Sequence, residues 1–247
     1  MPRHRATLFV TCVVDQLLPH IGMAAADLLE QLGVEVSVRP DVICCGQMGF
    51  NAGYRAEARG VARRTVLRLA NAEAVVVPSG SCASMIRHVY REVFQDTPDE
   101  SAAADLAVRT FELTEYLVDV LGVVDVGARF QGRIAYHHAC HGLRSLGLGR
   151  QALALLEHVR DAEIVEFTGA EDCCGFGGLF AIEHPGLSAT MLRRKMSNLD
   201  ASGADVLVTG DASCMMHVAG GLHRLGSTVQ ARHIAELLAN RVVVERA

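Results

Sequence analysis

Eight cysteines stand out in this 247-residue sequence because they form one pattern that occurs twice. In each half a lone cysteine is followed by a Cys-Cys-Gly triplet and then by a further cysteine. The lone cysteine and the pair are separated by 31 residues in the first half and 32 in the second, and the pair and the last cysteine by 36 and 39. The two sets are Cys12, Cys44, Cys45 and Cys82, and Cys140, Cys173, Cys174 and Cys214.

Four thiols that converge in each half are the ligand set of an iron–sulfur cluster or of a tetrahedral zinc ion. Buried structural cysteines would explain single thiols, but they do not account for two vicinal pairs in register. Zinc is the stronger alternative, although the Cys-x2-Cys spacing of zinc knuckles is absent. We therefore expect two clusters of the four-iron–four-sulfur type, with zinc as the metal that an apo or aerobic preparation would take up.

The composition indicates a globular chain and excludes two classes of function. Half of the residues are hydrophobic, and the formal net charge of −5 argues against a nucleic-acid surface. No run reaches the roughly 18 apolar residues of a membrane span. Residues 1–15 lack a small-residue cleavage site, so no signal peptide is expected and a cytoplasmic location is predicted. In that reducing compartment the cysteines are expected to be ligands or redox groups and not disulfides.

The hydrophobic pattern alternates between expected strands and expected helices. In the first half the pattern predicts strands at 6–12, 34–38 and 74–77, and helices at 21–32, 54–70, 83–94 and 111–118. In the second half it predicts strands at 133–137, 163–167 and 204–209, and helices at 150–159 and 187–202, while 229–239 repeats the extended entry into a helix at 108–118. The solvated stretch 95–104 is expected to be a surface insertion, and residues 123–132 are expected to link the halves.

This alternation predicts an α/β fold with parallel sheets and helices on both faces. The repeat divides it into two similar tandem Rossmann-like halves, residues 1–124 and 125–247, each of a common domain size. Cys12, Cys82, Cys140 and Cys214 directly follow expected strands. Because ligands gather at the carboxyl ends of parallel strands, we expect the thiols of each half to meet at one sheet edge.

Several phrases of the sequence carry a resemblance to a known family. They are Cys45-Gly-Gln47, Phe50-Asn-Ala-Gly-Tyr54, Pro78-Ser-Gly-Ser-Cys82, Tyr136-His137, Cys140-His141 and Cys174-Gly-Phe-Gly-Gly178. The paired repeats resemble the cysteine-rich domains of heterodisulfide reductase and of the glycolate oxidase iron–sulfur subunit. Over nearly the whole chain, the longer phrases are similar to the lactate-utilisation protein A family.

The resemblance implies an iron–sulfur electron-transfer subunit of a complex that oxidises L-lactate, a small 2-hydroxy acid, to pyruvate. It also implies two partners, a larger ferredoxin-like iron–sulfur subunit and a small third subunit. A cluster-based thiol–disulfide reductase of the heterodisulfide type is the alternative, and a zinc-stabilised assembly subunit is a third interpretation. The chain lacks a complete Gly-x-Gly-x-x-Gly loop between strand and helix, so dehydrogenation is expected at a cofactor elsewhere or at a shared site.

The sequence departs from the fuller form of the motif, in which each repeat ends in Cys-x-x-Cys. Ser79 and Asp211 stand at the position of the first of those cysteines. Four thiols per half still suffice for a cubane cluster. Asp211 offers an oxygen ligand, and Ser79 is expected to cap the helix that begins near Cys82.

Glycines follow both cysteine pairs and are expected to let backbone amides approach cluster sulfurs. These cofactor-binding candidates are Gly46, Gly175, Gly177 and Gly178. The loops 47–53 and 176–180 are expected to form the rim that faces a partner or a substrate. The Arg193-Arg194-Lys195 run is expected to be a docking face or a solvated helix surface.

Three histidines and an arginine surround Cys140 and are candidates for further chemistry. Imidazole can ligate iron or relay protons near neutral pH, and a guanidinium can bind a carboxylate. The candidate catalytic residues are His138, His141 and Arg144. For His137, which lies on an expected strand, a hydrogen-bonded core histidine is the preferred interpretation.

Overall fold

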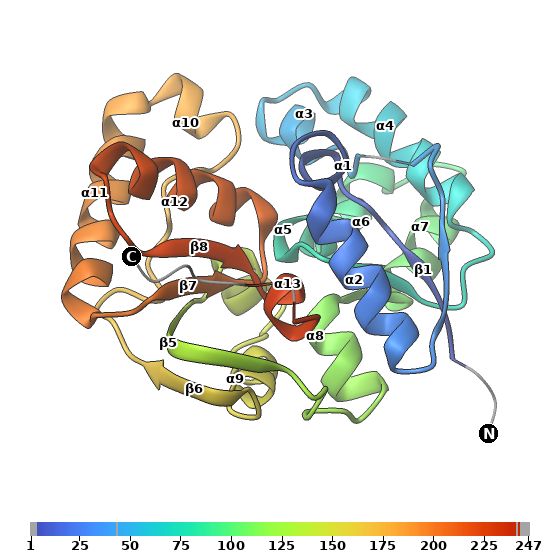
Figure 1. Ribbon diagram of the computed structural model, residues 1–247. Helices are drawn as coiled ribbons and strands as arrows, with labels where there is room; N and C mark the ends of the chain where they lie inside the picture. The colour runs from blue at the N-terminus through green and yellow to red at the C-terminus, as the bar shows by residue number, and fades with distance from the viewer. Residues whose placement is uncertain (1–3, 43, 241, 243–247) are drawn as a thin grey trace.

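The computed structural model describes residues 4–42, 44–240 and 242. Figure 1 shows two halves side by side, each built around a parallel four-stranded sheet. The first sheet has the order β2-β1-β3-β4, from β1 (Arg5–Leu8), β2 (Glu35–Val38), β3 (Val75–Val77) and β4 (Thr110–Glu112). The second has the order β6-β5-β7-β8, from β5 (Arg129–His137), β6 (Arg160–Val165), β7 (Val206–Thr209) and β8 (Gln230–His233). The matching orders confirm the predicted α/β fold with two similar halves.

Helices connect the strands in both halves. In the first half they are α1 (Cys12–Leu17), α2 (Pro19–Gln31), α3 (Gln47–Asn51), α4 (Arg55–Arg68), α5 (Gly80–Ser84), the π-helical turn η1 (Met85–Val89), α6 (Tyr90–Phe94), α7 (Glu100–Val108), α8 (Leu113–Glu115) and the π-helical turn η2 (Tyr116–Val120). In the second half they are the π-helical turn η3 (His141–Ser145), α9 (Arg150–Leu156), α10 (Phe180–Glu183), α11 (Pro185–Ser202), α12 (Ala212–Leu225) and α13 (Ile234–Leu238).

Two stretches that were predicted as irregular connections contain part of a helix or a strand. The stretch 95–104, expected to be a surface insertion, contains the start of α7, which buries Ala103 and Leu106. Its acidic residues misled the prediction because Asp99 and Glu100 lie at the helix N-terminus, where negative charge favours helix formation. The expected linker 123–132 ends in the first residues of β5, and Phe130 there is buried in the core.

The largest hydrophobic cluster joins the two halves. It includes Leu8 and Val76 from the first sheet together with Ile134 and Val208 from the second. Helix α2 of the first half packs against α13 of the second, and α8 packs against α9. Each half therefore covers part of the other, and burial of this common apolar surface stabilises their arrangement. The boundary between residues 124 and 125 stays a prediction.

None of the helices in the described part of the chain has the length and apolar composition that a bilayer-spanning segment requires.

Candidate metal centre

All eight cysteines line one cavity between the two halves. The cavity has a volume of about 120 Å³, and its wall also includes His141, Phe176 and Asp211. The strand order brings the thiols together. Strands β1 and β3 are neighbours, so the segments that follow them carry Cys12 and Cys82 to one sheet edge. Strands β5 and β7 are neighbours in the same way, and they bring Cys140 and Cys214 together.

Each vicinal pair contacts both cysteines that follow the strands of its half. In the first half the Cys44 thiol is hydrogen-bonded to Cys12, and the Sγ atoms of Cys45 and Cys82 are 3.3 Å apart. In the second half Cys173 is hydrogen-bonded to Cys140, and the Sγ atoms of Cys174 and Cys214 are 3.3 Å apart. These sulfur–sulfur contacts join members of one set and are longer than the roughly 2.05 Å of a disulfide.

The glycine after each pair supports the first thiol of that pair. The backbone N–H of Gly46 donates to Sγ of Cys44 at 3.3 Å, and that of Gly175 donates to Sγ of Cys173 at 3.4 Å. Both glycines have positive φ angles, 85° and 92°. A Cβ atom would lie 2.9 Å from a backbone oxygen at Gly46 and 2.7 Å at Gly175. Both positions therefore require glycine.

The hydrogen bonds favour one thiolate in each set. A hydrogen bond from Cys12 lowers the pKa of Cys44 to about 6. Hydrogen bonds from Cys140 and Cys174 likewise hold the pKa of the Cys173 thiol far below its ordinary value. Because the thiolate is the form that binds metal, each set is prepared for a metal ion or cluster. The eight cysteines that were predicted as ligands therefore form two sets of four thiols, and each set fits one metal ion or cluster.

Asp211 and Ser79 bind each other across the boundary between the halves. One carboxylate oxygen of Asp211 accepts hydrogen bonds from the Ser79 hydroxyl at 3.0 Å and the Ser81 N–H at 2.9 Å. The other accepts from the Ser213 and Cys214 N–H groups at 3.1 and 3.3 Å and caps α12. Burial alone would raise the pKa of Asp211, but hydrogen bonds from Ser213 and Ser81 hold it below its ordinary value.

This hydrogen bond corrects the prediction that Ser79 caps a helix, and it changes the interpretation of Asp211 as an oxygen ligand. Ser79 stands at the N-terminus of α5, but its side chain makes no capping hydrogen bond, because its hydroxyl is turned toward Asp211. Both oxygens of Asp211 already accept hydrogen bonds within the protein. The carboxylate therefore acts as a structural acceptor between the halves, although it also lines the cavity.

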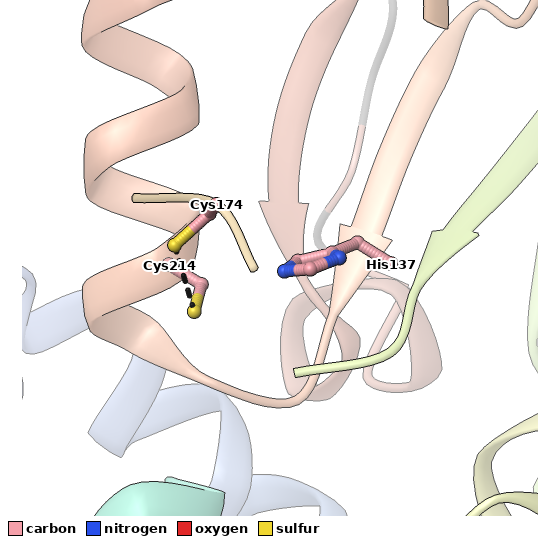
Figure 2. Close-up of side chains that lie close together, drawn as sticks. All are labelled: His137, Cys174 and Cys214. Atoms are coloured by element: carbon pink, nitrogen blue, oxygen red, sulfur yellow. Dashed lines mark hydrogen bonds between the residues drawn. The ribbon is translucent and has the colours of Figure 1, made fainter. Parts of the chain in front are cut away.

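His137 lies closer to the second set than the sequence indicated. Its Nδ1 is 2.9 Å from the carbonyl oxygen of Ala170, whereas its Nε2 is buried without a hydrogen-bond partner among the described residues. A ring nitrogen and the sulfurs of Cys174 and Cys214 all lie within 4.8 Å of one another. Figure 2 shows the imidazole pointing toward these two cysteines. A fully satisfied core histidine, the preferred interpretation from the sequence, does not describe this arrangement.

The candidate catalytic residues differ in their distance from the cavity. His141 lines it, with Nδ1 3.7 Å from Sγ of Cys140. His138 is not among the lining residues, and its ring packs edge-on against Tyr136. Arg144 is exposed and donates to the carbonyl of Glu171 at 3.2 Å. Their catalytic roles stay predictions.

Both segments predicted as a rim contribute to the cavity wall. The lining includes Gln47, Met48 and Asn51 from the first and residues 176–179 from the second. Residues 47–51 form the short helix α3, where a loop was expected, and Phe180 begins α10.

Lys195 departs from the predicted docking or solvated face, because it is buried on α11. Its ammonium donates to the carbonyl of Gly169 at 2.6 Å and lies 5.3 Å from the centre of the Phe167 ring. The pattern of a charged run on a helix could not show that one member of the run points inward.

Comparison with known proteins agrees with the repeated pattern. The CCG cysteine-rich domain model matches residues 6–87 and 134–219. A lactate utilization protein A from Geobacillus kaustophilus (strain HTA426) is 41% identical over 238 residues, 96% of this chain and 99% of that protein. Another from Exiguobacterium sp. (strain ATCC BAA-1283 / AT1b) is 43% identical over 234 residues, 94% of this chain and 95% of that protein.

Among solved structures, a putative Asp/Glu racemase from Yersinia pestis aligns over 96% of both chains, with 14% identity and a TM-score of 0.39. That similarity is too low to bear on function. The match of the cysteine-rich domain to both halves and the similarity over nearly the full length lead to one assignment. This chain belongs to the lactate utilization protein A family of CCG cysteine-rich proteins.

Proposed function

We propose that this chain is the iron–sulfur electron-transfer subunit of a complex that oxidises L-lactate to pyruvate. The observation that carries the proposal is the pair of four-thiol sets, which occupy equivalent sheet edges and line one cavity. Relatives that match nearly the full chain are lactate utilization proteins, which supports lactate as the substrate of the complex. With eight free thiols, the chain is proposed to act in the reducing cytoplasm.

The residues of the chain hold and tune the ligands. An iron–sulfur cluster, when bound, supplies electron transfer. Each set of four thiols would hold one cluster, and the Gly46 and Gly175 amides donate to a sulfur of each set. Such hydrogen bonds stabilise the anionic sulfur and adjust the reduction potential of a bound cluster.

Lactate oxidation removes two electrons in a hydride-like step, for which proteins use a flavin or a nicotinamide. We therefore assign dehydrogenation to a site that partner subunits supply or complete, namely a larger ferredoxin-like iron–sulfur subunit and a small third subunit. The rim segments 47–53 and 176–180 are the proposed contact for these partners, since both border the cavity.

A reconstitution assay tests the proposal. Lactate-dependent reduction of a dye is measured with the cluster-loaded chain alone, with the partner subunits alone and with the mixture. Activity is expected only in the mixture. Phe176→Ala should weaken the coupling without changing iron content, whereas Leu225→Ala, an exposed apolar residue at the end of α12, should have no effect. Full activity of the partners without this chain would contradict the proposal.

A thiol–disulfide reductase is the second candidate, because all eight cysteines face one cavity where a disulfide could meet both sets. This function requires that the cluster-loaded chain alone, supplied with electrons from a low-potential donor, reduces a small disulfide catalytically. Such turnover would favour the reductase over the carrier. Its absence, together with lactate oxidation by the full mixture, would exclude the second candidate.

A further inference from the structure

The two cysteine sets differ at one buried position. When Cys12 is aligned with Cys140, His137 of the second half corresponds to Phe9 of the first. Both side chains are buried, with 0% and 1% of their surface exposed. A phenyl ring at this position can only pack. An imidazole brings two polar nitrogens into the same apolar surroundings, and burying a polar atom without a partner is unfavourable.

The hydrogen bond of one ring nitrogen determines the state of the other. Nδ1 of His137 lies 2.9 Å from the carbonyl oxygen of Ala170, and a carbonyl can only accept a hydrogen bond. Nδ1 therefore carries the proton, and neutral imidazole keeps a lone pair on Nε2. This arrangement, with Nδ1–H donating to a backbone carbonyl, is the one that orients metal-binding histidines.

The lone pair of Nε2 has no partner in the described protein, and the ring points toward two thiols of the second set (Figure 2). The ring nitrogen and the sulfurs of Cys174 and Cys214 are within 4.8 Å of one another. Metal–nitrogen and metal–sulfur bonds are about 2.0–2.3 Å, so a small side-chain adjustment would let the imidazole bind the metal atom that one of these two sulfurs holds. A cluster sulfide, in contrast, would need a donor, and Nε2 in this tautomer is not one.

We propose that His137 is an additional metal ligand of the second set and binds through Nε2 beside Cys174 and Cys214. The inference rests on the proposed function for the identity of the metal, an iron–sulfur cluster. It makes the two sites chemically different. The first set, with Phe9 at the equivalent position, offers thiolates alone, whereas the second offers thiolates and an imidazole.

The two sites should then differ in reduction potential. An imidazole bound to iron beside the thiolates makes the potential of the second centre differ from that of the first, because ligand identity helps to set the potential of an iron–sulfur centre. The buried ammonium of Lys195, anchored on Gly169 in the same half, adds positive charge that favours the reduced state.

Pulsed electron paramagnetic resonance of the full chain tests the ligand directly. The protein is labelled with ¹⁵N-histidine, reconstituted anaerobically and reduced. A ¹⁵N coupling of directly bound strength is expected in the wild type. It should be lost in His137→Phe, which copies Phe9, and retained in His141→Gln, whose ring lies beside Cys140. His137→Phe should also shift the potential of one centre and leave the other unchanged.

The outcomes separate this inference from the proposed function. A cluster-loaded wild type without such a coupling overturns the role of His137, and so does loss of the coupling in His141→Gln alone. If anaerobic reconstitution yields no iron, the proposed function fails instead. His137 is then tested in the cobalt(II)-substituted protein, whose ligand-field spectrum should change in His137→Phe. An unchanged spectrum would overturn the inference.

Discussion

At the scale of single residues, the vicinal cysteines have different tasks. The first thiol of each pair faces the cysteine after β1 or β5 and accepts a hydrogen bond from the following glycine amide. The second thiol is buried and contacts the cysteine after β3 or β7. Two adjacent cysteines can contact both of the other cysteines of their half because those two follow neighbouring strands of one sheet.

Replacing one buried thiol should empty only one of the two sites. Cys174→Ser removes a ligand of the second set, and Cys45→Ser is the matched change in the first. In each variant we expect roughly half of the wild-type iron, because four cysteines hold one cluster. Iron and sulfide analysis after anaerobic reconstitution measures this. Wild-type iron content in Cys174→Ser would show that this residue is not a ligand.

The glycine after the second pair should tolerate no side chain. At Gly175, φ is 92° and a Cβ would lie 2.7 Å from the carbonyl oxygen of Ser188. Gly175→Ala should lower the free energy of unfolding by at least about 1–2 kcal/mol, the cost of a left-handed conformation for alanine. Gly186→Ala is the control, since a Cβ there meets no atom within 4 Å. Equal stability of the two variants in chemical denaturation would contradict the close contact.

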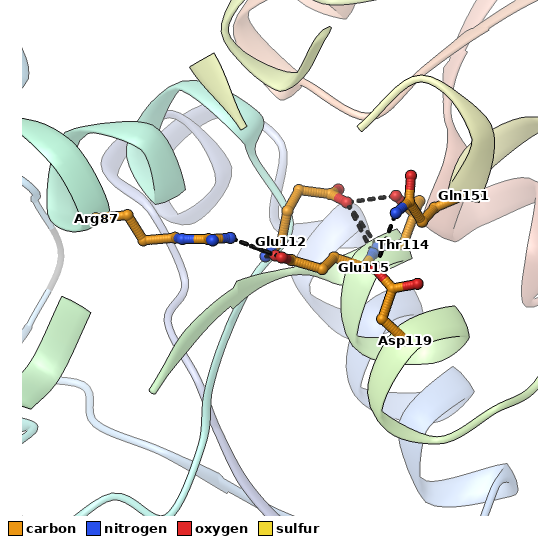
Figure 3. Close-up of polar contacts among 6 residues, drawn as sticks. All are labelled: Arg87, Glu112, Thr114, Glu115, Asp119 and Gln151. Atoms are coloured by element: carbon orange, nitrogen blue, oxygen red, sulfur yellow. Dashed lines mark hydrogen bonds and ion pairs between the residues drawn. The ribbon is translucent and has the colours of Figure 1, made fainter. Parts of the chain in front are cut away.

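At the scale of elements, equivalent strand-to-helix junctions use different residues. Glu112 ends β4 and caps α8 in a capping box with Glu115, while His233 ends β8 and caps α13 with Glu236. Figure 3 shows the first junction, where Glu115 also forms an ion pair with Arg87 at 2.7 Å. One oxygen of Glu112 is buried without a partner among the described residues. Burial raises the pKa of this carboxyl to about 7.

This junction should make stability depend on pH. Because the folded-state pKa of Glu112 is above the ordinary value of 4.5, the protonated form is favoured in the folded chain. The stabilisation of the folded chain by the protonated Glu112 carboxyl is fully present below about pH 4.5 and is lost as the pH rises through about 7. Between pH 5 and pH 8 the wild type should lose about 2–3 kcal/mol of unfolding free energy relative to Glu112→Gln. Parallel pH profiles for the two proteins in urea denaturation would exclude this contribution.

The strands could be predicted from the sequence where their hydrophobic pattern was long enough to show its period. All six expected strands coincide with observed ones, because their residues are either continuously apolar or alternate clearly between apolar and polar. The three residues of β4 are too few to show a period, and the start of β5 is interrupted by an irregularity near Gly132.

The site was predictable only as far as the repeat showed it. The register of the cysteines identified both sets. Which thiol contacts which depends on side-chain direction, and the Ser79–Asp211 contact joins residues far apart in sequence. The orientation of His137 likewise depends on the carbonyl of Ala170, which no local pattern indicates.

At the scale of the whole molecule, the two halves are related by their repeat and meet around the cysteine cavity. A common core, the packing of α2 on α13 and the Ser79–Asp211 hydrogen bond hold them together. The position where the fuller motif has a cysteine is used here for that contact.

Weakening this link should reduce stability without removing metal. Asp211→Asn leaves donors of Ser79 and Ser81 poorly satisfied, and we expect a loss of about 1–3 kcal/mol in unfolding free energy. Iron content should stay at the wild-type value, since the carboxylate is a structural acceptor. Asp200→Asn, an exposed residue whose side chain accepts from Ser227 in the same half, is the control. A loss of iron in Asp211→Asn with unchanged stability would identify Asp211 as a ligand.

The central claim is that each half of the chain holds one four-iron–four-sulfur cluster. Iron, acid-labile sulfide and zinc per chain, measured after anaerobic purification and reconstitution, test this claim most directly. Two such clusters predict about eight iron and eight sulfide per chain, with zinc near zero. A chain that retains one or two zinc ions and takes up no iron under these conditions would contradict the claim.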